Sequence, residues 1–88
     1  MRVIHEIRLN GMNPSVPRDA QILSVKMRDD GMYAWYTVDP SVSVLPVKRL
    51  LVLATGEEVT DGLTHIATVQ DRLDVWHVFI RQEARDDG

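Results

Sequence analysis

The sequence predicts an all-β fold, a small antiparallel β-sandwich or a partly open barrel of about six to seven strands with little or no helix. Short stretches rich in β-branched and aromatic residues alternate between apolar and polar positions. Turn residues separate these stretches at the spacing of about eight to twelve residues that is typical of small β domains. No stretch of the chain repeats the apolar spacing of an amphipathic helix.

The first predicted strand spans residues 3–9, whose odd-numbered positions share a mostly apolar face. Asn10 and Gly11 then predict a turn. Residues 13–17 contain two prolines, which favour an edge strand or a connector because proline cannot donate a hydrogen bond to a ladder.

Residues 20–27 resume as a strand. The side chains expected to share one face of it are Leu23, Val25 and Met27. Residues 29–31, Asp-Asp-Gly, predict a tight hairpin turn because glycine readily adopts the positive φ that such turns need. The partner strand is residues 32–38, and it ends before the Asp-Pro pair at 39–40.

The second half of the chain continues with a loop at residues 41–46 and a strand at 47–55 that we expect to be buried on both sides in its middle. Residues 57–64 contain three acidic residues and, counting Gly56 just before them, two glycines, and they predict a loop with at most one helical turn. A second hairpin then joins residues 65–70 to residues 73–81.

The chain of 88 residues has room for a single β domain, which we place at residues 1–82, with a polar tail at 83–88 that we expect to be disordered. It contains no cysteine, so neither disulfides nor thiolate metal sites can stabilise it. Domains of this size bury little more than about 60% of their unfolded surface. A small buried fraction leaves a domain with low stability, and oligomerisation commonly compensates for this. We therefore expect a homo-oligomer or a complex with another protein.

Two strands carry apolar or aromatic side chains on both faces, so the chain offers more apolar β-surface than one core needs. The surplus has three explanations: burial under a closed barrel or the 41–46 loop, a partner or self-association interface, or an aromatic ligand groove. The residues that we take as interface candidates are Tyr33, Trp35, Trp76, Val78 and Ile80.

The charge and motif content exclude several classes of function. The formal net charge of −3 and the scattered basic residues argue against nucleic acid as a partner, and no apolar run is long enough to cross a membrane. The three histidines, His5, His65 and His77, lack any recognised metal-binding spacing. We therefore expect no catalytic residue, no metal and no cofactor.

Several short motifs occur in a recognisable order, and they are "VIHEIRL", "VPRDAQILSVKM", "AWYTVDP", "LATGEEV", "LTHIATVQ" and "VWHVF". In this order the chain resembles a family of short bacteriophage and prophage proteins of unknown function over about residues 3–81. The resemblance implies a phage or prophage origin and an accessory role in the host cytoplasm. The 41–46 loop, "SVSVLP", is more apolar than the family pattern.

From these observations we expect a non-enzymatic phage accessory protein that binds a host protein or itself through an aromatic β-surface. An alternative is a small-ligand protein that sequesters a nucleotide signal, in which Arg28, Lys48 and Arg49 converge with an aromatic ring. A third alternative is a structural component of the virion.

Overall fold

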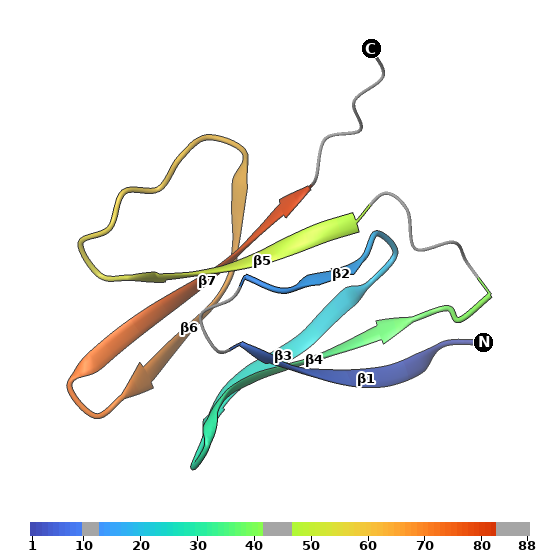
Figure 1. Ribbon diagram of the computed structural model, residues 1–88, viewed down its shortest axis with the longest axis horizontal. Coiled ribbons are helices and arrows are strands. Elements are labelled where there is room, and N and C mark those ends of the chain that lie inside the picture. The colour runs from blue at the N-terminus through green and yellow to red at the C-terminus, as the bar shows by residue number, and fades with distance from the viewer. Residues whose placement is uncertain (10–12, 42–46, 83–88) are drawn as a thin grey trace.

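The computed structural model describes residues 1–9, 13–41 and 47–82, and within them the chain forms two antiparallel sheets and no helix (Figure 1). The strand order is β1-β4-β3 in one sheet and β2-β5-β7-β6 in the other. The strands are β1 (Val3–Leu9), β2 (Ser15–Pro17), β3 (Gln21–Arg28), β4 (Gly31–Val38), β5 (Val47–Ala54), β6 (Leu63–Asp71) and β7 (Asp74–Gln82). The all-β class is confirmed, and in the described residues the sheets form a small open sandwich rather than a closed barrel.

Strand β4 lies at the centre of the three-stranded sheet and alternates strictly between buried and half-buried residues. Its buried residues are Met32, Ala34, Tyr36 and Val38. The predicted hairpin between β3 and β4 is confirmed, with Arg28 paired to Gly31 across the turn. Gly31 has a φ of +141°, a conformation that residues with a Cβ rarely adopt.

The face predicted for β3 is wrong at Leu23 because the strand contains a register shift between Ile22 and Ser24. At such a bulge two residues oppose one on the partner strand, so the alternation of side chains changes sides. Ile22 therefore packs against the core with Val25 and Met27, whereas Leu23 is 54% exposed.

In the four-stranded sheet, β7 lies between β5 and β6, and its residues Trp76, Val78 and Ile80 face the core. Val78 is completely buried, and Trp76 and Ile80 pack beside it. Ala67 and Val69 of β6 join this face, although β6 also has a register shift, between His65 and Ala67.

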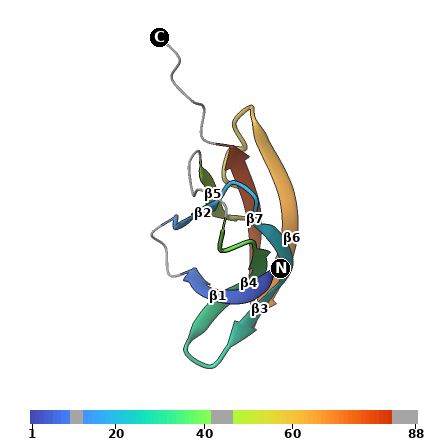
Figure 2. The same ribbon diagram turned by 90° about the vertical axis from the view of Figure 1, so that its right-hand side faces the viewer.

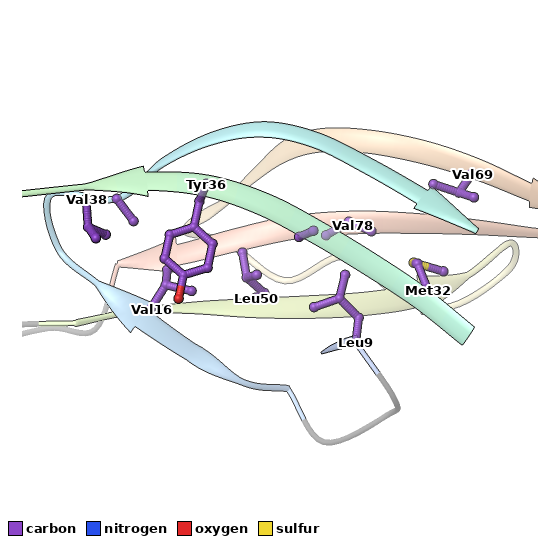
Figure 3. Close-up of a cluster of buried hydrophobic side chains, with 10 residues drawn as sticks. Leu9, Val16, Met32, Tyr36, Val38, Leu50, Val69 and Val78 are labelled. Atoms are coloured by element: carbon purple, nitrogen blue, oxygen red, sulfur yellow. The ribbon is translucent and has the colours of Figure 1, made fainter. Parts of the chain in front are cut away.

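The core lies between the two sheets, as Figure 3 shows. Its buried members come from both sheets and are Leu9, Val16, Ala20, Met32, Ala34, Tyr36, Val38, Leu50, Val69 and Val78. The sheets approach each other most closely along β3 and β6 (Figure 2). Since residues 10–12, 42–46 and 83–88 lie outside the described residues, so do the predicted Asn10–Gly11 turn, most of the predicted 41–46 loop and the predicted tail.

The first residues of the chain tie three segments together through Arg2. Its guanidinium donates to the backbone oxygens of Asp19 and Thr37, each at 2.8 Å, and lies 3.4 Å from the Asp19 carboxylate. Asp19 in turn accepts a hydrogen bond from the backbone N–H of Asp39 at 2.9 Å. These contacts connect the start of β1, the β2–β3 turn and the end of β4.

Candidate binding surfaces

The structure divides the predicted interface residues between two environments. Tyr33 and Trp35 lie half-buried on the outer face of β4. Trp76, Val78 and Ile80 face the core, so the expectation that they form an outer surface is wrong for the protomer. This burial follows from the register, because these three residues pair with Ala54, Val52 and Leu50 on the inner face of β5.

The opposite side of β5 and β7 forms a surface that we call the apolar outer face, defined by Leu51, Leu53, Val75, His77 and Phe79. Each of these side chains is half-buried. The pairs Leu51–Phe79 and Leu53–His77 face each other across the two strands. Outer faces of antiparallel sheets usually carry polar side chains, so this apolar composition is unusual.

Two histidines and two threonines form a hydrogen-bonded row across this face. The imidazole of His77 lies 2.9 Å from the Thr55 hydroxyl through Nε2 and 3.1 Å from the Thr68 hydroxyl through Nδ1. The same Thr68 hydroxyl lies 2.8 Å from His65 Nε2. The His65 ring also meets Phe79 edge-on, with 5.3 Å between the ring centroids. The row satisfies both ring nitrogens of His77 and fixes the orientation of its imidazole.

A hollow of about 230 Å³ opens beside this row. Its apolar wall includes Leu53, Phe79 and Val59, and Val59 belongs to the segment that follows β5. Glu57 closes the turn of that segment, because its carboxylate accepts a hydrogen bond from the Ala54 N–H at 2.5 Å. The hollow is a concave, mostly apolar feature of the kind that receives one side chain of a partner.

The outer face of the three-stranded sheet carries aromatic and charged groups side by side. The rings of Tyr33 and Trp35 are 6.2 Å apart, and the Arg28 guanidinium lies 5.0 Å from the Tyr33 ring centroid. Arg28 also forms an ion pair with Glu6 at 3.4 Å. The structure therefore brings one of the three predicted ligand-binding cations together with two predicted aromatic residues.

The Tyr33 hydroxyl donates a hydrogen bond to the Asp30 carboxylate at 2.8 Å. This bond lowers the pKa of Asp30 below its ordinary value and raises the pKa of Tyr33 above its own. Inside the sheet, burial raises the pKa of Tyr36.

The other two predicted cations lie in the four-stranded sheet and are used differently. Lys48 donates to the backbone oxygen of Ala20 at 3.1 Å, and Arg49 donates to that of Asn13 at 2.9 Å. They therefore do not converge with Arg28 on one ligand, and the predicted three-cation site is not formed in the protomer.

A third feature, which we call the end cleft, opens between the sheets beside the β3–β4 and β6–β7 turns. The cleft has a volume of about 350 Å³. It is lined by Leu9, Met27, Gly31, Met32, Val52, Asp71 and Trp76. A polar hollow of about 550 Å³ adjoins it and shares Met27, Gly31 and Asp71. The other residues that line this polar hollow are charged, and they are Arg28, Asp29, Arg72 and Asp74.

The described residues contain no cluster of three or more histidine and carboxylate side chains that could hold a metal ion. Within the same residues no helix exists that could cross a membrane. His5, the remaining histidine, lies edge-on to Tyr36 with 5.8 Å between the ring centroids.

Sequence reasoning predicted surplus apolar surface on residues 73–81 but assigned it to the side with Trp76, Val78 and Ile80, so it missed the residues of the apolar outer face, and it also missed the end cleft. The signal for the first was present, because residues 50–54 and 75–80 are apolar at nearly every position. The cleft had no local signal, since its lining comes from six strands or their ends that are distant in sequence.

A family model described as "Domain of unknown function (DUF7352)" matches residues 1–88. Comparison with curated proteins and with solved structures finds no match.

Proposed function

The chain belongs along its whole length to the DUF7352 family, a domain of unknown function, and from this premise we propose that it works by binding a partner protein through the apolar outer face. One observation carries the proposal. Strands β5 and β7 have the composition of strands that are covered on both sides, yet the other sheet covers only the side with Trp76, Val78 and Ile80.

A partner would gain most from the centre of this face. Leu53 and Phe79 are half-buried aliphatic and aromatic groups beside the hollow that Val59 borders. Anchoring side chains in protein interfaces commonly enter such hollows, and the surrounding polar groups exclude water. The hydrogen-bonded His65–Thr68–His77–Thr55 row supplies that polar border and is already ordered.

The proposal includes a biological setting. The order of the motifs supports an accessory protein of a phage or prophage that acts in the host cytoplasm. Its presence in infected-cell lysate and its absence from purified virions, both measured by mass spectrometry, would support this setting. Abundance in purified virions, or a large defined assembly in light scattering, would instead favour a structural component of the virion.

The test of the binding surface is capture of a partner from host lysate, followed by affinity measurement with the purified partner. Leu53→Glu should weaken binding about tenfold or more, since it places a charge at the centre of the contact. Leu23→Glu is the matched control, because Leu23 is 54% exposed on the other sheet. If both variants fold and bind the partner as tightly as the unmodified chain, the apolar outer face is not the binding surface.

A second candidate function rests on the contact between Arg28 and Tyr33 beside Trp35. An aromatic pair with an adjacent guanidinium suits a nucleotide, because a base stacks on a ring while the cation holds a phosphate. Native mass spectrometry of protein freshly purified from host cells should then show a bound small molecule. Arg28→Gln should release it, and Arg18→Gln, which changes an exposed cation in the turn between β2 and β3, should not.

A further inference from the structure

We infer that residues 55–62, which we call the strap, close over the apolar outer face in the partner-free protein and seat Val59 in the hollow beside Leu53 and Phe79. The inference rests on the proposed function, because it assigns a regulatory contact to the same face. A partner that binds this face must then displace the strap. The support comes from the path of the strap across the sheet, its exposure and its single apolar side chain.

The strap joins two strands that are not neighbours. The strand order is β5-β7-β6, so the chain must pass β7 on its way from β5 to β6. It leaves β5 after Ala54, which lies opposite Trp76, and it enters β6 at Leu63, which lies opposite Arg81. It therefore spans most of the length of β7. Figure 1 shows it as a wide loop between the two strands.

The middle of the strap lies on the outer side of the sheet. Val59 borders the hollow of about 230 Å³, and two other apolar walls of this hollow are Leu53 and Phe79 of the apolar outer face. The inner side of β5 and β7 packs against the core. The strap is therefore placed beside the surface that it closes over.

The structure shows the strap in an open position. All of its residues are exposed, in contrast to the half-buried side chains of the face beside it. The hydrogen bonds that fix it lie at its start, where the Thr55 hydroxyl contacts His77 and Glu57 closes a turn on Ala54. The start of the strap is therefore anchored, while its middle is exposed to water.

A glycine lies near each end of the strap and can act as a hinge. Gly56 has a φ of +100° and Gly62 a φ of +86°, and a Cβ added at either position would meet no atom within 4 Å. Glycine adopts positive and negative φ with similar ease, and segments that close over a site commonly turn at a few such loop positions. The strap can therefore move as a unit between these two residues.

Val59 is the apolar side chain that gains from closure. It is the one apolar residue of the strap, and it is 53% exposed. Seating it in the hollow removes its surface, and that of Leu53 and Phe79, from water. A side chain of the same chain reaches the hollow at a high effective concentration, because a short tether holds it there. Val59 therefore occupies the hollow ahead of a partner that is free in solution.

The cysteine-free sequence allows a direct test of the closed state. The double variant Val59→Cys with Phe79→Cys should form an intramolecular disulfide under mild oxidation, which peptide mapping by mass spectrometry detects. Val59→Cys with Leu23→Cys is the matched control and should not form one, because Leu23 is 54% exposed on the other sheet. Equal linking in both variants, or none in either, overturns the inference.

Nuclear Overhauser effects test the same contact in the unmodified protein. The methyl groups of Val59 should show them to the Phe79 ring and to the Leu53 methyl groups. Their absence overturns the closed state, whatever the cysteine variants do.

Affinity for the purified partner tests the regulatory role through its sign. Val59→Thr replaces one methyl group by a hydroxyl and favours the open strap, so the partner should bind about threefold more tightly or better. Ile4→Thr is the matched control, since Ile4 is 65% exposed on β1 of the other sheet. Unchanged or weaker binding by Val59→Thr overturns the inference.

The disulfide-locked protein separates the two proposals. It should lose partner binding and regain it on reduction, whereas Leu53→Glu should bind weakly in both conditions. A locked protein that binds as tightly as the reduced one overturns the regulatory role of the strap. The disulfide and the Overhauser effects need no partner, so they decide on the closed state even where Leu53→Glu excludes the apolar outer face as the binding surface.

Discussion

Single side chains in the β3–β4 turn carry the clearest electrostatic signature of the molecule. The Tyr33 hydroxyl donates to Asp30 at 2.8 Å, and Arg8 donates to the backbone oxygen of Asp30. Sequence could predict this turn from Asp-Asp-Gly, because the backbone requirement is local. It could not predict the Arg8 contact, since β1 reaches the turn only through its pairing with β4.

The Tyr33–Asp30 bond predicts how Tyr33→Phe alters stability with pH. Folding lowers the pKa of Asp30, so the bond stabilises the fold at pH values above the ordinary pKa of aspartate. This stabilisation is lost as the pH falls through the lowered pKa that Asp30 has in the folded protein. The raised pKa of Tyr33 gives a second contribution, present below the ordinary tyrosine pKa and lost as the pH rises through the folded-state value.

Urea unfolding of Tyr33→Phe and the unmodified chain should therefore differ near neutral pH and converge towards pH 2 and above pH 11, roughly where those groups change charge. A difference in unfolding free energy that stays constant from acid to alkali would contradict this assignment.

Gly31 provides a second prediction at this scale. A Cβ added there would lie 2.9 Å from Arg8 Nε, and the φ of +141° already disfavours other residues. Gly31→Ala should destabilise the fold by about 1–3 kcal/mol in thermal or urea unfolding. Gly56→Ala is the matched control, because Gly56 has a φ of +100° but no atom within 4 Å of the added Cβ. A smaller loss for Gly31→Ala than for Gly56→Ala would show that Arg8 moves aside without cost.

At the level of elements, β7 shows what alternation can and cannot predict. Its existence follows from the dense β-forming residues between turns. Which face of β7 points inward cannot be predicted in this way, because Val75, His77 and Phe79 are as compatible with a core as Trp76, Val78 and Ile80. The choice depends on the pairing with β5 and on the shifted register of β6, both of which are set by distant residues. For the same reason the bulge that turns Leu23 outward had no signal in the strand itself.

Two valines of β7 test this assignment with the same chemical change. Val78 is fully buried and Val75 is half-buried on the apolar outer face. Val78→Ala should cost about 2 kcal/mol of unfolding free energy, and Val75→Ala should cost less than half of that in the isolated protein. Equal losses in equilibrium unfolding would mean that something covers both faces of β7 in solution.

The whole molecule is an open sandwich in which most neighbouring strands are distant in the chain. Among the strands of the described residues, only the β3–β4 and β6–β7 pairs are hairpins, whereas β1 pairs with β4, β2 with β5 and β5 with β7. The sequence predicted the class and both hairpins, but it contained no local information on these three longer pairings. The end cleft and the apolar outer face are products of those pairings, so they could be described only from the fold.

This topology predicts slow folding for so short a chain. Long loops must close before the non-local strands pair, so refolding should take about milliseconds to seconds, as in other small β domains. Stopped-flow tryptophan fluorescence would measure it. Refolding within microseconds would indicate that the two hairpins alone form most of the stabilising structure.

The pairing of β1 also determines how the molecule can be handled. Val3 pairs with Val38 at one end of the sandwich, and Leu9 pairs with Met32 beside the end cleft at the other (Figure 1). A tether or fluorophore on residue 1 is therefore held away from both hairpin turns. A protein anchored to a sensor chip through its amino terminus would point its turns and cleft towards the flowing sample.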